Sequence, residues 1–245
     1  AFAILSGRRI GLMQRSTMQE AIAAPKVGGI VRLTGFILKA ALVMELAGTA
    51  LLLPTFSREF GFFQGAWYAL FHAVSAFCNA GFDLFGIREP FSSLTFYHSN
   101  IYLNIIIMML IITGGIGFLV WGDIRIHKNR IRRFSLQSKV VLMTSAVLIV
   151  LPALYFFFYE YDRETIHDRT IHSLFQSVTT RTAGFNTTDL AAMDESGTAI
   201  MIILMLIGGS PGSTAGGMKT TTLAVLLANA TATFRQRDSA RFFGR

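Results

Sequence analysis

Four long apolar stretches, each close to the length of a membrane span, dominate the pattern of hydrophobic and polar residues along the chain. They cover residues 33–53, 100–122, 140–159 and 198–218. The last three contain no charged residue, and the first contains only Lys39 and Glu45. A helix needs about 20 mostly apolar residues to cross the hydrocarbon core of a bilayer, so each stretch predicts one membrane-spanning helix.

Two shorter apolar segments interrupt this series, residues 66–77 after the first long stretch and residues 170–180 after the third. Segments of this length are too short to span a membrane and predict re-entrant or interfacial helices. The order of elements is therefore long, short, long, repeated once. It predicts an all-α membrane protein built from two M1–P–M2 units, in which a re-entrant helix and its loop (P) lie between two spanning helices (M1 and M2).

The loops that follow the two short segments are alike in sequence. Residues 70–82 and 174–185 align with one residue fewer in the second copy. They end in Asn79-Ala80-Gly81-Phe82 and Thr182-Ala183-Gly184-Phe185. Irregular backbone at membrane depth is tolerated only where it is buried in protein or lines a water-filled path. Glycine allows an extended backbone whose carbonyls replace the hydration shell of an ion, and the aromatic after it is expected to anchor the loop against surrounding helices.

We therefore predict that these eight residues, mainly through their backbone carbonyls, form two segments of a potassium-selective filter. One such tetrapeptide is a weak signal, but two at equivalent places in a duplicated unit are a strong one. The alternative is a pair of similar tight turns in an unrelated membrane protein.

Charge placement predicts the orientation in the membrane. Only 15% of the residues are charged, against about 25% in soluble domains, which indicates that lipid contacts much of the surface. Three basic segments hold fifteen basic residues and only three acids; the basic residues are Arg8, Arg9, Arg15, Lys26, Arg32, Arg125, Lys128, Arg130, Arg132, Arg133, Lys139, Arg235, Arg237, Arg241 and Arg245. Because positively charged loops stay in the cytoplasm, we expect a multi-pass membrane protein whose basic loops face the cytoplasm; the family resemblance described below implies the bacterial inner membrane. The net charge of +8 thus needs no nucleic-acid partner.

The last apolar stretch is interrupted by a glycine-rich segment. Residues 208–217 contain five glycines and Pro211, and Lys219 follows directly. Since glycine and proline disfavour a helix interior, we predict a helix that is broken within the membrane and forms a flexible gate below the filter. The gate residues are Gly208, Gly209, Ser210, Gly212, Ser213, Thr214, Gly216, Gly217 and Lys219. A loop at the cytoplasmic end with Lys219 reaching the interface is the alternative.

Two charged residues are candidates for filter support. Arg181 directly precedes the second tetrapeptide; it either pairs with a carboxylate behind the loop, which we favour, or reaches the outer mouth. Glu45 lies in the middle of the first apolar stretch, where a charge exposed to lipid is costly. We expect it to form a buried hydrogen bond to a pore loop rather than to bind an ion.

Gly208-Gly209-Ser210-Pro211-Gly212 also fits the Gly-x-Ser-x-Gly pattern of serine hydrolases. That pattern requires a strand before the serine and a helix after it, whereas an apolar helix is predicted before it here and Pro211 follows the serine. An intramembrane serine hydrolase using Ser210 is the alternative from the enzyme class, and we do not expect the chain to be an enzyme.

The paired loops, the Gly-Ser-Thr-Ala-Gly-Gly-Met-Lys segment at residues 212–219, Gly7-Arg8-Arg9 and the stretch 28–32 resemble the Trk/Ktr/HKT superfamily of potassium transporters. The resemblance covers essentially the whole chain. It implies four M1–P–M2 repeats around one pore, of which residues 27–124 would be the second and 135–229 the third. Residues 1–26, 125–134 and 230–245 would be cytoplasmic linkers, and the first and fourth repeats would lie outside this chain.

The same resemblance implies a homodimer within the bilayer and a cytoplasmic ring of nucleotide-binding regulatory subunits of the RCK type. Potassium would be the permeant ion and sodium a candidate coupling ion. Gly81 and Gly184 match members that select potassium. Asn79 departs from the threonine of an idealised filter, which leaves a sodium-permeable member of the family as an alternative.

Overall fold

The computed structural model describes residues 29–128 and 130–236 together with the single positions 11, 13, 16, 17, 19, 20 and 242. The predicted linker 1–26, including Arg8 and Arg9, and the end of the predicted linker 230–245 lie largely outside the described residues. The longer helices are α3 (Ile30–Phe60), α4 (Phe62–Phe77), α5 (Ile101–Ile116), α6 (Phe118–His127), α7 (Leu136–Tyr155), α8 (Ile166–Thr179), α9 (Glu195–Leu206) and α10 (Thr220–Phe234). Shorter helical turns are η1 (Phe85–Ile87), η2 (Thr95–Tyr97), η3 (Ile131–Arg133), the π-helical η4 (Phe156–Glu160) and η5 (Leu190–Ala192).

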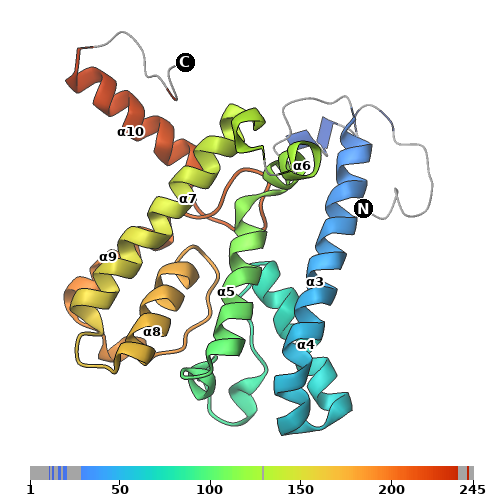
Figure 1. Cartoon of the computed structure of the whole chain (residues 1–245), viewed down its shortest axis with the longest axis vertical. Coiled ribbons are helices and arrows are strands. Elements are labelled where there is room, and N and C mark those ends of the chain that lie inside the picture. Colours follow the sequence, from blue (N-terminus) through green and yellow to red (C-terminus); the bar gives the residue numbers. More distant parts are fainter. Residues whose placement is uncertain are drawn as a thin grey trace.

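The first unit begins with the long helix α3 and turns back at once into α4. Gly61, with a φ of 78°, separates the two helices. A side chain at Gly65 would place its Cβ 2.5 Å from the Cα of Ser57, so glycine is required where the start of α4 crosses the end of α3. Figure 1 shows α3 running along much of the long axis of the molecule while α4 lies in its lower half.

The second unit repeats this order with α7 and α8. The Ser135 hydroxyl caps α7 by accepting from the Ser138 N–H at 3.2 Å, and the Thr165 hydroxyl caps α8 by accepting from the Asp168 N–H at 3.3 Å. The helix α8 packs against α7 and also against α5 of the first unit. Like α4, it lies in the lower half of Figure 1. The predicted pair of short helices is therefore present, each packed against the long helix before it.

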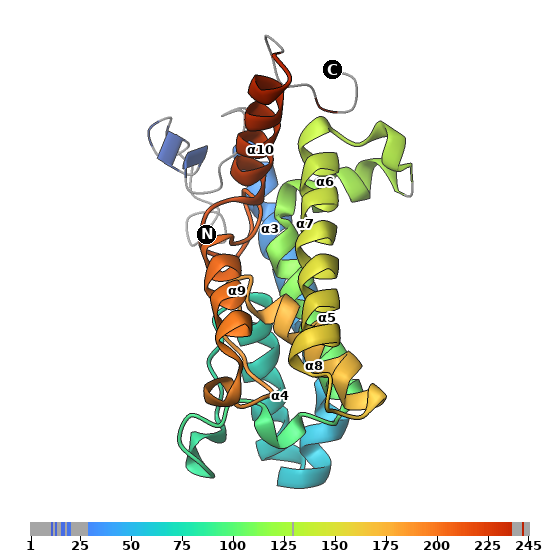
Figure 2. The same cartoon turned by 90° about the vertical axis from the view of Figure 1, so that its left-hand side faces the viewer.

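The third helix is broken in both units, which corrects the prediction of one continuous span over residues 100–122. The helix α5 ends at Ile116, and α6 leaves it at an angle of 91°. Gly117 forms the corner with a φ of 95°. In the second unit, α9 and α10 are separated by the irregular segment 207–219, so the predicted break in that helix is confirmed. Figure 2 shows this segment between α9 and α10.

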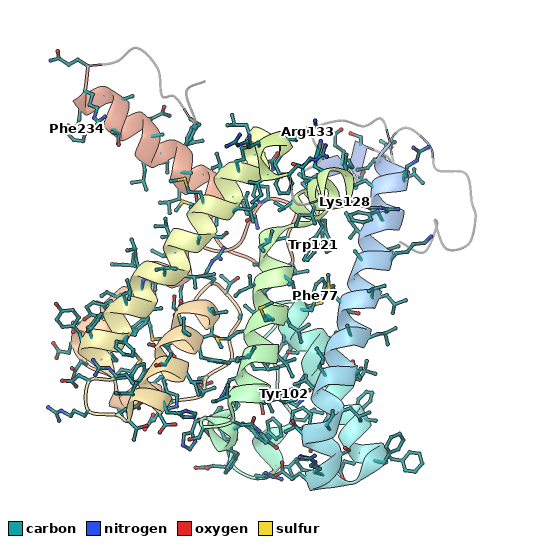
Figure 3. All side chains as sticks on the ribbon, in the orientation of Figure 1. Phe77, Tyr102, Trp121, Lys128, Arg133 and Phe234 are labelled. Carbon is teal, nitrogen blue, oxygen red and sulfur yellow. The ribbon has the colours of Figure 1, made fainter. Side chains whose placement is uncertain are left out.

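In the described ranges, α3 and the segment Leu136–Glu160 are each long and apolar enough to cross a membrane, and the bent pair α5–α6 adds a third if it counts as one span. The two ends of the molecule differ in character. Figure 3 places Lys128 and Arg133 at one end, Tyr102 toward the other, and Phe77 between these levels. The helix α4 therefore ends between the two ends of the molecule, where the first loop begins.

Candidate functional site

The two predicted filter loops share one backbone conformation. Asn79 and Gly81 have positive φ angles of 51° and 70°, and the equivalent Thr182 and Gly184 have angles of 66° and 85°. The residues between and after them do not have positive φ. Such alternation turns successive carbonyls toward one side of the chain, as in a carbonyl-lined ion filter. Thr182 is β-branched, for which a positive φ is a genuine outlier; strain of this kind is held at functional sites by the surrounding structure.

A hydroxyl group on each re-entrant helix holds the carbonyl that follows the filter glycine. The Ser75 hydroxyl donates to the Phe82 carbonyl at 2.8 Å, and the Thr179 hydroxyl donates to the Phe185 carbonyl. Ser75 and Thr179 were not among the predicted site residues. They occupy the same place in the aligned segments 70–82 and 174–185, so a hydroxyl at equivalent positions was the signal that could have identified them.

The two loops contact each other through backbone atoms. A Cβ added at Gly81 would lie 2.5 Å from the Ala183 carbonyl oxygen and 2.7 Å from the Cα of Gly184. A Cβ added at Gly184 would lie 3.2 Å from the Cα of Gly81. The loops are thus adjacent, and a side chain on either glycine would push them apart.

The predicted anchoring role of the aromatic residues holds for only one loop. Phe185 is 1% exposed, as expected for an anchor, but Phe82 is 69% exposed in the described part of the chain. Phe85 is fully buried behind the first loop instead, where it stacks on His72 with ring centroids 4.7 Å apart. The turn η1 brings Phe85, three residues later, into the space between α3 and α4, and the anchoring role of Phe82 stays a prediction.

The glycine-rich segment 207–219 folds back on itself as a closed loop. The N–H groups of Gly208 and Met218 donate to the carbonyls of Met218 and Leu206 at 2.9 and 3.0 Å, respectively. The Thr220 N–H donates to the Gly209 carbonyl at 3.1 Å. The loop therefore leaves α9 and re-enters α10 at neighbouring points, so that residues 210–216 project as a tip.

This tip lies directly against both filter loops. The Thr214 hydroxyl donates to the Phe77 carbonyl at 2.8 Å and accepts from the Asn79 side-chain amide at 2.8 Å. The Gly216 N–H donates to the Thr182 hydroxyl at 3.0 Å. The first residue of each filter tetrapeptide therefore bonds the glycine-rich loop, which the sequence did not predict for Asn79. These contacts also place the loop at the level of the filters, against the alternative of a loop at the basic end.

The same tip supplies the hydrogen bonds missing at the break in α5. The Ser210 N–H donates to the Gly115 carbonyl at 3.0 Å, and the Thr214 N–H donates to the Gly114 carbonyl at 3.3 Å. In return, the Phe118 N–H donates to the Gly212 carbonyl at 2.8 Å. The loop between α9 and α10 thus forms hydrogen bonds with the backbone groups that are left free where α5 ends and α6 begins.

Other gate candidates have local roles. The Lys219 ammonium donates to the Ala215 carbonyl at 2.9 Å, inside the loop. A Cβ at Gly208 would lie 1.7 Å from the Gly216 carbonyl oxygen, and one at Gly209 would lie 2.5 Å from the Ala215 Cβ. Gly212 and Gly217 have positive φ angles of 66° each. These glycines permit the two arms of the loop to lie against each other.

Arg181 lies behind the second filter loop, but the predicted carboxylate partner is not there. Its side chain is 6% exposed and donates to the Ser145 hydroxyl at 3.2 Å. Among the described residues it forms no ion pair, and its Nε is buried without a partner. The correction follows from its surroundings, because the face of α7 next to Arg181 presents Ser145 rather than an acid.

Glu45 contacts the first pore loop, in agreement with the prediction. Its carboxylate accepts from the Cys78 thiol at a sulfur–oxygen distance of 3.8 Å, and Cys78 directly precedes Asn79. The contact is half-buried, and the supporting role of Glu45 stays a prediction.

Ser210 does not have the surroundings of a nucleophile. It is fully buried, and its hydroxyl shares a hydrogen bond with the Thr220 hydroxyl at 3.1 Å. The helix α9 precedes it in place of the strand that a hydrolase requires. The hydrolase alternative has no support in this geometry.

Comparison with known proteins agrees with this arrangement. The chain matches the TrkH family, described as cation transport proteins, over residues 6–243. It has the fold of the potassium transporter TrkH from Vibrio parahaemolyticus, with a TM-score of 0.72 at 16% identity over 92% of this chain and 46% of that one.

Curated relatives are transporters as well. The potassium/sodium uptake protein NtpJ of Enterococcus hirae is 39% identical, with 100% of this chain and 54% of the relative covered. The Ktr system potassium uptake protein B of Bacillus subtilis is 35% identical, with 99% and 54% covered. The chain spans about half the length of these relatives. With a match over nearly its whole length and with relatives that are transporters rather than enzymes, this chain belongs to the TrkH family of cation transport proteins.

Proposed function

We propose that the protein containing this chain takes up potassium ions across a bacterial inner membrane along a path lined by the two filter loops. The observation that carries this proposal is their matching backbone, with left-handed residues at Asn79 and Gly81 in one loop and at Thr182 and Gly184 in the other. Both loops also have a hydroxyl-held carbonyl after the glycine. Carbonyls arranged in this way replace the water lost by a potassium ion.

The re-entrant helices support the same path electrostatically. Both α4 and α8 end where a filter loop begins. The carboxyl end of a helix carries the negative end of its macrodipole, so each helix directs partial negative charge toward an ion at this level. The touching loops provide two adjacent walls, and the remaining walls would come from the first and fourth repeats.

The glycine-rich loop is the gate in this proposal. Its tip binds Phe77 and Asn79 of the first unit and Thr182 of the second. An ion that leaves the filters toward the basic end meets this loop first. Opening requires these hydrogen bonds to break, and the glycines of the loop allow the backbone to move.

Orientation, ion coupling and partners complete the proposal. The basic loops face the cytoplasm, because basic residues gather at one end of the molecule. The names of the two relatives favour potassium, with sodium as a second permeant or a coupling ion. A homodimer and an RCK-type regulatory ring on the cytoplasmic side follow from the family resemblance.

The test is potassium-limited growth of a transport-deficient bacterium that expresses the full-length gene. Gly81→Ser and Gly184→Ser should fail to restore growth at the low potassium concentrations at which the wild-type gene restores it. Gly86→Ser is the matched control, because a side chain at Gly86 meets no atom within 4 Å. Normal growth with both filter variants at normal membrane abundance would overturn the filter assignment.

A further inference from the structure

A large cavity lies between α3 and α6, at the end of the molecule that carries the basic loops. Its volume is about 670 Å³, and three cationic side chains line it: Arg32 and Lys39 of α3 and Arg125 of α6. The residues that line this cavity are distant in sequence from the filter loops, and none of them belongs to the site described above.

The three cations are not neutralised within the described residues. None of Arg32, Lys39 and Arg125 forms an ion pair or hydrogen bond there, and Arg125 only stacks on the Phe36 ring at 5.2 Å. The nearest acid in sequence, Asp123, accepts two hydrogen bonds from Ser135 at 2.7 and 2.9 Å. Among the described residues, no acidic side chain therefore offsets the positive charge of the cavity.

Helical spacing brings these groups to one face and leaves room between them. Arg32, Phe36 and Lys39 are separated by four and three residues, which places them on one side of α3. Gly35 and Gly122 also line the cavity, and a side chain at either would meet no atom within 4 Å. The two glycines keep the cavity open.

The position of Lys39 identifies the environment. It is an exposed lysine within the long apolar helix α3, and a lysine at such a position extends its ammonium to the level of the lipid headgroups. Leu33, Phe36 and Ile126 add apolar lining beside the cations. An ion in water would use only the charges, whereas a phospholipid presents a phosphate and an acyl chain together.

We infer that this cavity binds the headgroup of an anionic phospholipid, with its phosphate held by Arg32, Lys39 and Arg125 and its acyl chain against Phe36 and Ile126. Basic pockets between membrane helices are known to hold such headgroups. Under the proposed orientation the lipid belongs to the cytoplasmic leaflet. Binding itself depends on neither the orientation nor ion conduction.

The test is native mass spectrometry of the detergent-purified full-length protein, titrated with phosphatidylglycerol or with phosphatidylcholine of the same acyl chains. The wild type should retain phosphatidylglycerol preferentially. The variant Arg32→Gln/Lys39→Gln/Arg125→Gln should lose on the order of 100-fold in affinity, since each basic residue near the surface contributes roughly fivefold. Gly122→Leu fills the cavity without changing a charge and should also lose the preference.

The control Arg130→Gln/Arg132→Gln/Arg133→Gln removes three charges from the neighbouring loop, outside this cavity, and should retain binding. Equal retention of both lipids by the wild type, or retention by Gly122→Leu, would overturn the inference. Competition with inorganic phosphate at millimolar concentration distinguishes a lipid headgroup from free phosphate as the ligand of this cavity. Full displacement of the lipid by free phosphate would assign the cavity to a soluble anion and contradict the lipid assignment.

Discussion

The Thr214 hydroxyl donates to the Phe77 carbonyl at 2.8 Å, and this bond ties the middle of the glycine-rich loop to the residue where the first re-entrant helix ends. The two residues are far apart in sequence and belong to different units. Because Phe77 lies two residues before Asn79, a movement of the glycine-rich loop removes a hydrogen-bond partner from the start of the first filter loop.

Thr214→Val should weaken the closed position of the gate. The variant removes two hydrogen bonds, to Phe77 and from Asn79, each with a net contribution of about 1 kcal/mol. We expect the ratio of closed to open gate to fall roughly tenfold or more and resting potassium flux in proteoliposomes to rise accordingly. Thr222→Val, at an exposed position on α10, is the control. Deletion of the glycine-rich loop should raise the flux further. If the potassium flux of Thr214→Val and of the deletion variant both stay at the wild-type level, the loop is not a gate.

The two filter glycines should respond unequally to serine. Both have positive φ angles, which cost an L-residue about 1 kcal/mol or more. The added Cβ meets backbone at 2.5 Å at Gly81 but at no less than 3.2 Å at Gly184. We therefore expect Gly81→Ser to lose more potassium-over-sodium selectivity in competition uptake assays. A greater loss of potassium-over-sodium selectivity with Gly184→Ser would contradict the expectation that the tighter contact at Gly81 makes that position the more sensitive one.

Arg181→Gln should impair ion selectivity, because the guanidinium fills a buried position directly before the filter and bonds Ser145. Ser145→Ala removes only that bond and should have a smaller effect in the same direction, about 1 kcal/mol. Arg163→Gln changes an exposed charge of the same kind and should have none. Unaltered potassium and sodium uptake in Arg181→Gln would exclude a supporting role for this residue.

Tyr97→Phe should lower the thermal stability of the full-length protein in detergent. The buried Tyr97 hydroxyl donates to Glu59 at 2.5 Å, and Glu59 also pairs with Arg88 at 2.5 Å. The loss should be about 1 to 2 kcal/mol, whereas Tyr159→Phe, at a site 70% exposed, should change little.

The contribution of the Tyr97–Glu59 hydrogen bond to stability depends on pH through the ionisation of Tyr97. Burial, with a further contribution from Glu59, raises the pKa of Tyr97. An unfolded tyrosine titrates near pH 10, so the contribution is fully present below about pH 10 and is lost as the pH rises toward the folded pKa. The difference in melting temperature between wild type and Tyr97→Phe should be constant between about pH 6 and 9; a difference that disappears within that range would contradict the assignment.

Much of the architecture could be predicted from periodicity alone. The length of the apolar stretches predicted the spanning helices, and the aligned loops predicted two equivalent filters, because a duplicated unit repeats its local sequence. The break at Gly208–Gly217 followed from helix propensity. These are local properties. The structure agrees with the two similar loops and with the break, it gives two or, with the bent pair, three of the four expected spans among the described residues, and the role of the loops as a filter stays a prediction.

The remaining features depend on contacts between distant segments. The bend at Gly117 was missed although Gly114, Gly115 and Gly117 signal a weak helix there, because the hydrogen bonds from residues 210–214 that complete the bend come from a distant segment. The partner of Arg181 was misassigned because the sequence does not show that α7, which contains no acidic residue, packs behind this loop. The burial of Phe85 in place of Phe82 depends on a three-residue shift set by η1.

The exchange of hydrogen bonds between the α5 break and the glycine-rich loop has a consequence for biogenesis. Residues 114 and 115 are synthesised and inserted well before residues 210–214, which later bond their carbonyls. Backbone carbonyls without partners are costly in hydrocarbon. We therefore expect the corner at Gly117 to reach its final shape only after the second unit has entered the membrane, so that a chain ending before residue 207 would be inserted without this bend.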